Sequence, residues 1–243
     1  MIKKTIKTWT CITATFTAVL FSACNSEPKE PNKLTEKEVQ DGWTLLFDGK
    51  SLKGWHIFNK GAIPSSWTVR NGELFCDPDS KDRKGDLVSD GSYENYDLRF
   101  EWKLAKEGNS GVFINVLEVD TLNSVWNSGP EYQLLDDYHQ DYDKPLKKAG
   151  CLYGFTPQKN LVKTKISGDW NQGRIVQENG KTEFYLNDVL TAEVDFKSPQ
   201  WQKMVKQSTF ASFPEFGKHT SGKIALQDWA HGVSFRNIKI KVL

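Results

Sequence analysis

The stretch Val176-Gln-Glu-Asn-Gly-Lys-Thr-Glu-Phe184 decides the fold class. Residues of high β propensity flank Asn179-Gly180, a dipeptide that accepts the positive φ angles of a two-residue hairpin turn. The stretch therefore predicts two antiparallel strands. Val69-Arg-Asn-Gly-Glu-Leu74 has the same form and predicts a second hairpin.

Short apolar or alternating runs recur along residues 41–243 and fit a period of two better than a period of 3.6. The runs are Thr44–Phe47, Trp67–Val69, Leu98–Trp102, Val112–Leu117, Tyr132–Leu135, Thr182–Leu186, Lys223–Leu226 and Val233–Ile240. Further tight turns are expected at Asp48-Gly49, Asp90-Gly91 and Asn187-Asp188. A single short helix is favoured, at Pro199–Lys206 with Ser198 as its N-cap. We expect one all-β domain, a jelly-roll β-sandwich of two antiparallel sheets with one short helix.

The N-terminus has the pattern of a signal peptide over residues 1–23. Met1–Lys7 is basic, and Trp9–Leu20 is mainly apolar but too short to span a bilayer. Leu20-Phe-Ser-Ala-Cys24 resembles a bacterial lipobox, which implies a lipid on Cys24 and a polar tether over residues 24–40. An ordinary signal peptide with a free Cys24 stays open, because Phe21 stands where Leu or Val is usual. We expect a lipid-anchored protein of the cell envelope, facing the periplasm or on the outer-membrane surface.

Charge and cysteine content narrow the functional classes. Removal of residues 1–23 takes three lysines from 32 basic residues and leaves 29 against 31 acidic ones, a net charge of −2. A role in nucleic-acid binding is therefore disfavoured. Cys76 and Cys151 are the cysteines left in the domain, and whether they pair is open. No Cys-x-x-Cys or His-x-x-His spacing is present, so a structural zinc site is not expected.

Four strings in order span the whole mature domain and resemble the family of 3-keto-disaccharide hydrolase domains. They are Gly42–Trp55, Gly108–Phe113, Gly129–Asp136, and Gly222–Gly232 followed by Phe235–Ile238. The resemblance implies a concanavalin A-like jelly roll, the fold of many lectins and glucanases, and an enzyme that acts on 3-keto-disaccharides or 3-keto-glucosides. One departure is that Trp229-Ala230 separate His231 from Gln227-Asp228, the pair that the family's histidine often follows directly.

A 3-keto sugar sets particular chemical demands on a site. Its carbonyl acidifies the hydrogen on C2, so the C1 substituent can leave through an enolate, and such a route needs a base, an oxyanion stabiliser and a proton donor. We expect the enzyme to cleave the glycosidic bond or to hydrate the derived enone. The hypothesis is that Glu131 and His231 share the acid and base roles, with Arg236 and Asn109 near the enolate oxygen. Expected substrate-binding residues are Asn109, Gln133, Gln227, Asp228, Trp126, Trp229 and His139.

Several of these residues also have plain structural interpretations. Arg236 could brace the last strand by pairing with an acid, and His231 before Gly232 could belong only to a turn. Trp43, Trp55, Trp67 and Trp102 are expected in the core. The loop Tyr138–Tyr142 could act as a lid or specificity loop. Asp136, Asp137, Asp141 and Asp143 crowd this region but lack the spacing of a known calcium loop, so neither a metal nor a cofactor is expected.

Three other functions remain open from the sequence. They are a non-catalytic carbohydrate-binding lipoprotein, a structural or adhesion domain that binds no sugar, and an endo-glucanase, which needs two acids about 5–10 Å apart. Because no dinucleotide fingerprint is present, a separate sugar oxidoreductase would have to make the ketone. The expected partners are thus an oligosaccharide or keto-glycoside substrate, that oxidoreductase and a membrane.

Overall fold

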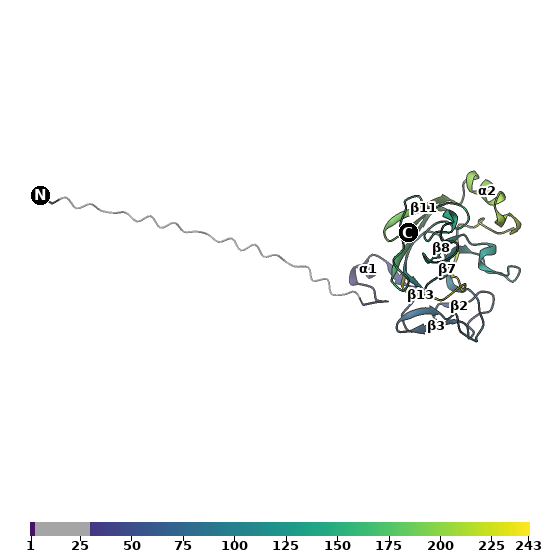
Figure 1. Ribbon diagram of the computed structural model, residues 1–243, viewed down its shortest axis with the longest axis horizontal. Coiled ribbons are helices and arrows are strands. Elements are labelled where there is room, and N and C mark those ends of the chain that lie inside the picture. Colours follow the sequence, from purple (N-terminus) through teal and green to yellow (C-terminus); the bar gives the residue numbers. More distant parts are fainter. Residues whose placement is uncertain (3–29) are drawn as a thin grey trace.

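Two antiparallel sheets form the framework of the protein, as the computed structural model shows for residues 1–2 and 30–243 (Figure 1). The eight-stranded sheet consists of β11 (Val189–Asp195), β10 (Lys181–Leu186), β9 (Asn171–Glu178), β6 (Tyr96–Leu104), β13 (Val233–Val242), β4 (Glu73–Cys76) and β3 (Trp67–Arg70), with β1 (Trp43–Leu45) also paired to β13. The five-stranded sheet has the order β2 (Trp55–Ile57), β5 (Leu87–Tyr93), β12 (Gly222–Leu226), β7 (Asn109–Val116) and β8 (Glu131–Leu135). The expected β-sandwich is confirmed.

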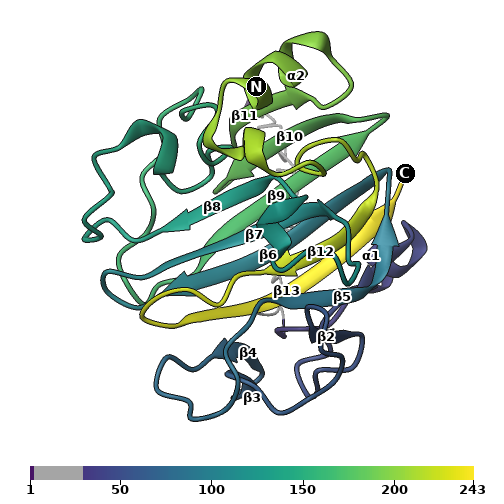
Figure 2. The same cartoon turned by 90° about the vertical axis from the view of Figure 1, so that its right-hand side faces the viewer.

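Helical segments are few and short. The α-helices are α1 (Glu36–Gln40) and α2 (Pro199–Lys206), and the 3-10 helices are η1 (Val125–Asn127), η2 (Pro145–Lys147) and η3 (Thr209–Ser212). Figure 2 shows α2 at one end of the sandwich and the β3–β4 hairpin at the opposite end. No helix among the described residues is long and apolar enough to cross a membrane. The predicted signal peptide and the lipid on Cys24 lie outside the described residues.

The two predicted hairpin turns and the predicted start of the helix are confirmed. Asn179 and Gly180 have φ angles of 52° and 85° between β9 and β10, as a two-residue hairpin turn requires. Asn71-Gly72 joins β3 to β4 in the same way. Helix α2 begins at Pro199, and the Ser198 side chain accepts a hydrogen bond from the Trp201 N–H.

Two predictions about local structure are wrong. Asp90-Gly91, expected to be a tight turn, lies inside β5, where the pairing with β12 shifts register as in a β-bulge. Residues 30–40, expected to belong to a flexible tether, contain α1 and contact the sandwich. Asn32 and Asn237 exchange side-chain-to-backbone hydrogen bonds of 2.6 and 2.8 Å, and Glu38 pairs with Lys239.

The main core lies between the two sheets and is rich in aromatic side chains. Tyr132 from β8 contacts Phe100 of β6 and Phe184 of β10 edge-on, which joins one sheet to the other. The four tryptophans expected in the core are all buried, namely Trp43, Trp55, Trp67 and Trp102. A smaller apolar cluster consists of Phe58, Val88, Phe113, Val116, Val125 and Ala225. Most of its strand residues alternate with those of the main core, so this cluster lies on the outer face of the five-stranded sheet.

Candidate functional site

A row of polar side chains crosses the outer face of the five-stranded sheet. Val112 and Tyr132 point into the core between the sheets, so their strand neighbours face outward. Gln133 lies opposite Gly111, and the Gln227 N–H donates to the Gly111 carbonyl at 3.0 Å. Asp86 precedes the paired residue Leu87 of β5, which places it beside Gln227. Across the four strands, this polar row consists of Asp86, Gln227, Gly111 and Gln133. The next outward-facing row consists of Val88, Ala225, Phe113 and Glu131.

The missing side chain at Gly111 makes room for the carboxyl group of Glu131. A Cβ atom at Gly111 would lie 2.0 Å from Glu131 Oε1, so the carboxyl group lies directly over this glycine. It is thereby placed in the polar row, between Gln133 and Gln227. With its amide nitrogen toward Glu131, Gln133 donates to Glu131 Oε1 at 3.0 Å and to the Ser110 carbonyl at 3.1 Å. Strand alternation predicted the face of Glu131, and Gly111 determines where its carboxyl group lies.

The carboxyl groups of Glu131 and Asp86 are both buried and both have raised pKa values. Burial raises the pKa of Glu131 well above its usual range, the negative charge of Asp86 adds to this, and Lys147 opposes it. Burial also raises the pKa of Asp86 to about 7, although Asp86 accepts a hydrogen bond from the Asp228 N–H at 3.0 Å. Asp86 was not among the predicted site residues, because only the register of four strands brings it near Glu131.

Glu131 opens onto a cleft of about 450 Å³. The cleft contains seven expected site residues: Asn109, Trp126, Glu131, Gln133, His139, Gln227 and Trp229. It also contains Gln140 and Asp141, from the loop expected as a lid or specificity loop. Four further lining residues were not predicted, namely Lys147, Tyr153, Thr209 and Phe210. Much of one wall comes from the loop that follows β8 and projects beyond this edge strand in Figure 2. This volume and the mixture of aromatic and polar side chains are typical of a site for a small ligand.

The wall formed by the loop carries a lysine, a carboxylate and a histidine. Lys147 Nζ lies 2.8 Å from Asp141 Oδ2, and hydrogen bonds from Lys144 and Lys147 lower the pKa of Asp141 to about 2. His139 Nδ1 accepts the Asp141 N–H at 3.1 Å, which leaves Nε2 as the donor of the neutral ring. Lys147 is thus a cation close enough to Glu131 to lower its pKa.

Arg236 does not line the cleft, so the structure does not place it beside Glu131 as its expected catalytic role requires. It lies on β13, in the eight-stranded sheet, where its Nε is 2.7 Å from Glu101 Oε2 and its guanidinium covers the ring of Trp170. Its neighbour Phe235 points into the core, so Arg236 faces away from it. The arginine braces the last strand by pairing with an acid, which is the structural interpretation left open by the sequence.

His231 and Asp228 also lie outside the cleft, although close to it. His231 is exposed in the turn between β12 and β13, with a φ angle of 59°. Asp228 Oδ2 accepts hydrogen bonds from Ser66 Oγ at 2.6 Å and from the Gly85 N–H at 2.9 Å, so this carboxylate fixes loops. Both residues line a neighbouring hollow instead.

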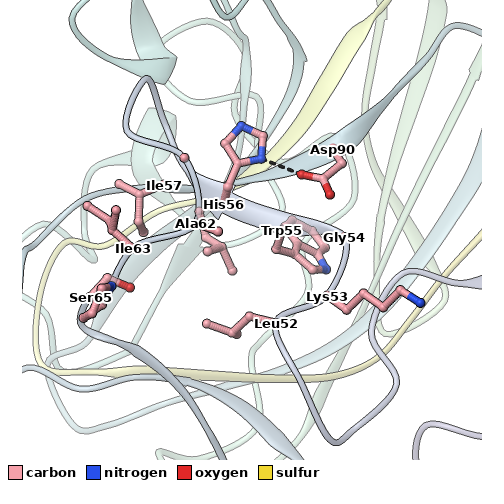
Figure 3. A pocket seen from close by; sticks show the side chains of 13 residues that line it. Leu52, Lys53, Gly54, Trp55, His56, Ile57, Ala62, Ile63, Ser65 and Asp90 are labelled. Atoms are coloured by element: carbon pink, nitrogen blue, oxygen red, sulfur yellow. Dashed lines mark hydrogen bonds and ion pairs between the residues drawn. The ribbon is translucent and has the colours of Figure 1, made fainter.

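A third hollow, of about 750 Å³, is formed around β2 and the loop that follows it (Figure 3). Its lining is mostly apolar, with His56 and Asp90 at one side. Both ring nitrogens of His56 are already engaged, Nδ1 with Asp90 Oδ1 at 2.6 Å and Nε2 with Glu118 Oε2 at 2.9 Å. This hollow therefore offers fewer unengaged polar groups than the cleft of Glu131.

The described residues were also compared with the arrangements that a metal site and a disulfide require. No group of three or more His, Cys, Asp or Glu side chains among the described residues is arranged to hold a metal. Asp136 accepts hydrogen bonds from the Glu107 N–H and from Ser167 Oγ, which engages both of its oxygens. Cys76 and Cys151 are both buried and free, so the disulfide left open above is not formed.

Known proteins resemble this chain in sequence and structure. Residues 42–241 match the family described as the 3-keto-alpha-glucoside-1,2-lyase-like domain. A 3-keto-disaccharide hydrolase of Bacteroides thetaiotaomicron is 32% identical over 230 residues, which cover 84% of this chain and 79% of the relative.

Solved structures agree with the sequence matches. A crystal structure from Parabacteroides distasonis, named a "putative glycosyl hydrolase", has 31% identity and a TM-score of 0.81, and the alignment covers 88% of this chain and 100% of the other. A Bacillus subtilis protein with a galectin-like fold has 10% identity and a TM-score of 0.52 over 88% of this chain and 94% of the other, which supports the fold alone. The expected classification as a hydrolase is confirmed by the family and the relative. The chain belongs to the family of 3-keto-alpha-glucoside-1,2-lyase-like domains.

Proposed function

We propose that this protein cleaves the glycosidic bond of 3-keto-glycosides in the cleft of Glu131. The observation that carries the proposal is a buried carboxyl group of raised pKa, held beside an amide in a cleft with tryptophans. A carboxylate of raised pKa is a stronger base than an ordinary glutamate, and its acid form can return a proton to the substrate. Membership of the family and the name of the Bacteroides relative support the 3-keto sugar as substrate.

The proposed chemistry balances without a cofactor. A base removes the proton on C2, and its electron pair forms an enolate at the C3 oxygen. Collapse of the enolate expels the C1 substituent, which takes up a proton and leaves a C1=C2 enone. Water then adds across this bond, with hydroxide at C1 and a proton at C2. The net reaction consumes one water and releases the free 3-keto sugar and the leaving group.

The cleft supplies a group for each of these steps. Glu131 is the proposed base at C2. Its carboxyl proton exchanges with solvent in the cleft, and Glu131 then donates a solvent-derived proton to C2 when water adds. Lys147 takes the place expected for Arg236, near the developing enolate oxygen, together with the Asn109 amide. His139 takes the acid role proposed for His231, because His139 lines the cleft. Trp126 and Trp229 offer faces on which a sugar ring can stack.

One observation favours a second candidate, direct hydrolysis of unoxidised glycosides. Glu131 and Asp141 both line the cleft, and their pKa values are shifted in opposite directions. Pairs of carboxyl groups with separated pKa values are the usual acid and nucleophile of glycosidases. However, Asp141 is paired with Lys144 and Lys147, which weakens it as a nucleophile.

A pair of substrates distinguishes the two candidates. The purified protein is incubated in deuterated water with a 3-keto-disaccharide and with its unoxidised parent, and the products are examined by mass spectrometry and NMR. The proposal predicts turnover of the ketone alone, with deuterium at C2 of the product. Equal turnover of the parent, or product without deuterium at C2, would contradict the enolate route.

We also propose that Cys24 carries a lipid and that a separate oxidoreductase supplies the ketone. The supporting pattern is the lipobox-like segment at residues 20–24, and no dinucleotide fingerprint is present in the sequence. Mass spectrometry of the N-terminal peptide from membranes should show an acylated Cys24, and a Cys24→Ser variant should appear in the soluble fraction. An unmodified Cys24 at the mature N-terminus would contradict the anchor.

A further inference from the structure

A second hollow adjoins the cleft and shares part of its wall. It has a volume of about 730 Å³ and lies between residues 76–84 and the turn at residues 228–233. Asn109 and Trp229 line both this hollow and the cleft that contains Glu131. The two spaces therefore meet at these two residues. Each is large enough for a small ligand or for one part of a longer one.

The shared wall is fixed in position. The Asn109 N–H donates to the Ala230 carbonyl at 3.3 Å, and the Ala230 N–H donates to the Asn109 carbonyl at 3.2 Å. On the other side of Trp229, the Asp228 carboxylate is held by Ser66 and Gly85. Trp229 itself is 63% exposed. Its indole ring thus stands in solvent on an ordered backbone, so little chain entropy is lost when a ligand stacks on it.

The lining of the hollow suits a hydroxyl-bearing group of no net charge. Lys84, Lys106 and His231 are exposed donors, and Asp79 is an exposed acceptor. The two lysines are balanced by Asp79 and Asp228, so the hollow has no excess of one charge. Among the lining residues, Trp229 alone is a Trp, Tyr or Phe. A flat aromatic ligand would therefore have an apolar contact on only one of its faces. A sugar ring satisfies both features, because it has polar edges and apolar C–H faces.

We propose that this hollow is the leaving-group subsite and that it binds a second, neutral sugar ring. This inference rests on the function proposed above and adds to it the place where the leaving sugar binds and the residues that hold it. The keto ring lies over Glu131, and the leaving sugar stacks on Trp229 and bonds to His231 and Lys106. His231 then contributes to substrate choice through the leaving group, not through proton transfer at the reacting ring.

The test compares two substrates that share the reacting ring. One is a 3-keto-disaccharide, and the other is methyl 3-keto-glucoside, whose leaving group is a single carbon. The measured quantity is the ratio of kcat/KM for the disaccharide to that for the methyl glycoside. His231→Asn is the main variant, because asparagine tolerates the φ angle of 59° at this position. Trp229→Ala is the second variant, and Ile166→Ala is the control, since Ile166 is 75% exposed and lines neither space.

We expect the ratio to fall about tenfold in His231→Asn and in Trp229→Ala, as for the loss of one good contact. The control should keep the wild-type ratio. An unchanged ratio in both variants would overturn the subsite while leaving the proposed function intact. Equal kcat/KM values for the two substrates in the wild-type protein would overturn it as well. If the wild-type protein cleaves neither ketone, the proposed function itself is wrong, and the subsite is withdrawn with it.

Discussion

Replacement of Gly111 by alanine tests the position of the proposed catalytic carboxyl group without replacing Glu131. The new Cβ would lie 2.0 Å from Oε1, 2.7 Å from Cδ and 2.8 Å from Cγ of Glu131, whereas real Cβ contacts stay above 3.0 Å. The carboxyl oxygen must therefore move by at least 1.0 Å, the difference between 3.0 and 2.0 Å. A displacement of this size at a reacting group costs about 100-fold in rate. We expect kcat/KM for a 3-keto-disaccharide to fall about 100-fold in Gly111→Ala.

The fold should tolerate this substitution. Gly111 lies within β7 and is not among the glycines with a positive φ angle, so alanine fits the backbone there. A glycine-to-alanine change also stabilises a protein by about 0.4–1 kcal/mol through the unfolded chain, which offsets part of the strain. Thermal unfolding should therefore show a cooperative transition within a few degrees of wild type. A large loss of activity with a retained transition separates displacement of Glu131 from unfolding.

A double-mutant cycle makes the assignment to Glu131 specific. If Gly111→Ala acts through the carboxyl group, adding it to Glu131→Gln should cause little further loss. A further 100-fold loss in the double variant would show that the alanine acts elsewhere. Wild-type kcat/KM in Gly111→Ala would refute the placement of the carboxyl group over this glycine.

Three other predictions follow from the site and its surroundings. The pKa of Asp86 is raised from 3.8 to about 7, so its protonated form is favoured in the folded protein. The free energy of unfolding should therefore fall by up to about 4 kcal/mol as pH rises from about 4 to about 7. In Asp86→Asn this pH-dependent loss of stability should be absent. Urea unfolding of both proteins at pH 5 and pH 8 measures it, and parallel pH profiles would contradict it. Arg236→Gln should keep kcat/KM within about twofold and cost less than about 1 kcal/mol, since its ion pair with Glu101 is partly exposed; a 100-fold activity loss would restore its catalytic role. Burial raises the pKa values of Cys76 and Cys151, so neither thiol should react with a thiol reagent in the native state, and both should react in urea; rapid native labelling would contradict their burial.

Local patterns predicted the strands and turns well where one segment determines its own geometry. Asn179-Gly180 and the capped start of α2 depend only on neighbouring residues, and the structure confirms both. Asp90-Gly91 has equally strong turn character, but the β5 pairing absorbs it as a bulge. Residues 30–40 looked like a linker because their composition is polar. The contact between Asn32 and Asn237 joins residues 205 positions apart, which no local pattern predicts.

The predictable parts of the site are those that follow from strand alternation and from the position of a loop in the sequence. Alternation placed Glu131 and Gln133 on one face, and their cleft contains most of the expected binding residues. It could not place Arg236, because alternation gives the face of a strand but not the sheet that the strand joins. Asp86 escaped notice for a related reason, since its nearness to Glu131 depends on register across β5, β12, β7 and β8. Lys147 lines the cleft through the path of the loop after β8, which no strand pattern predicts.

The kinetic effect of Glu131→Gln is the most direct test of the central claim. Glutamine keeps the size and the burial of the side chain but cannot exchange a proton, so the C2 step loses its base. The measurement is kcat for a 3-keto-disaccharide, with exchange of deuterium into C2 of the bound substrate followed in parallel. The proposed mechanism predicts a loss of about 1,000-fold or more in kcat, loss of the C2 exchange, and a thermal transition close to wild type. Near-normal turnover or retained C2 exchange in Glu131→Gln would remove this residue from the mechanism.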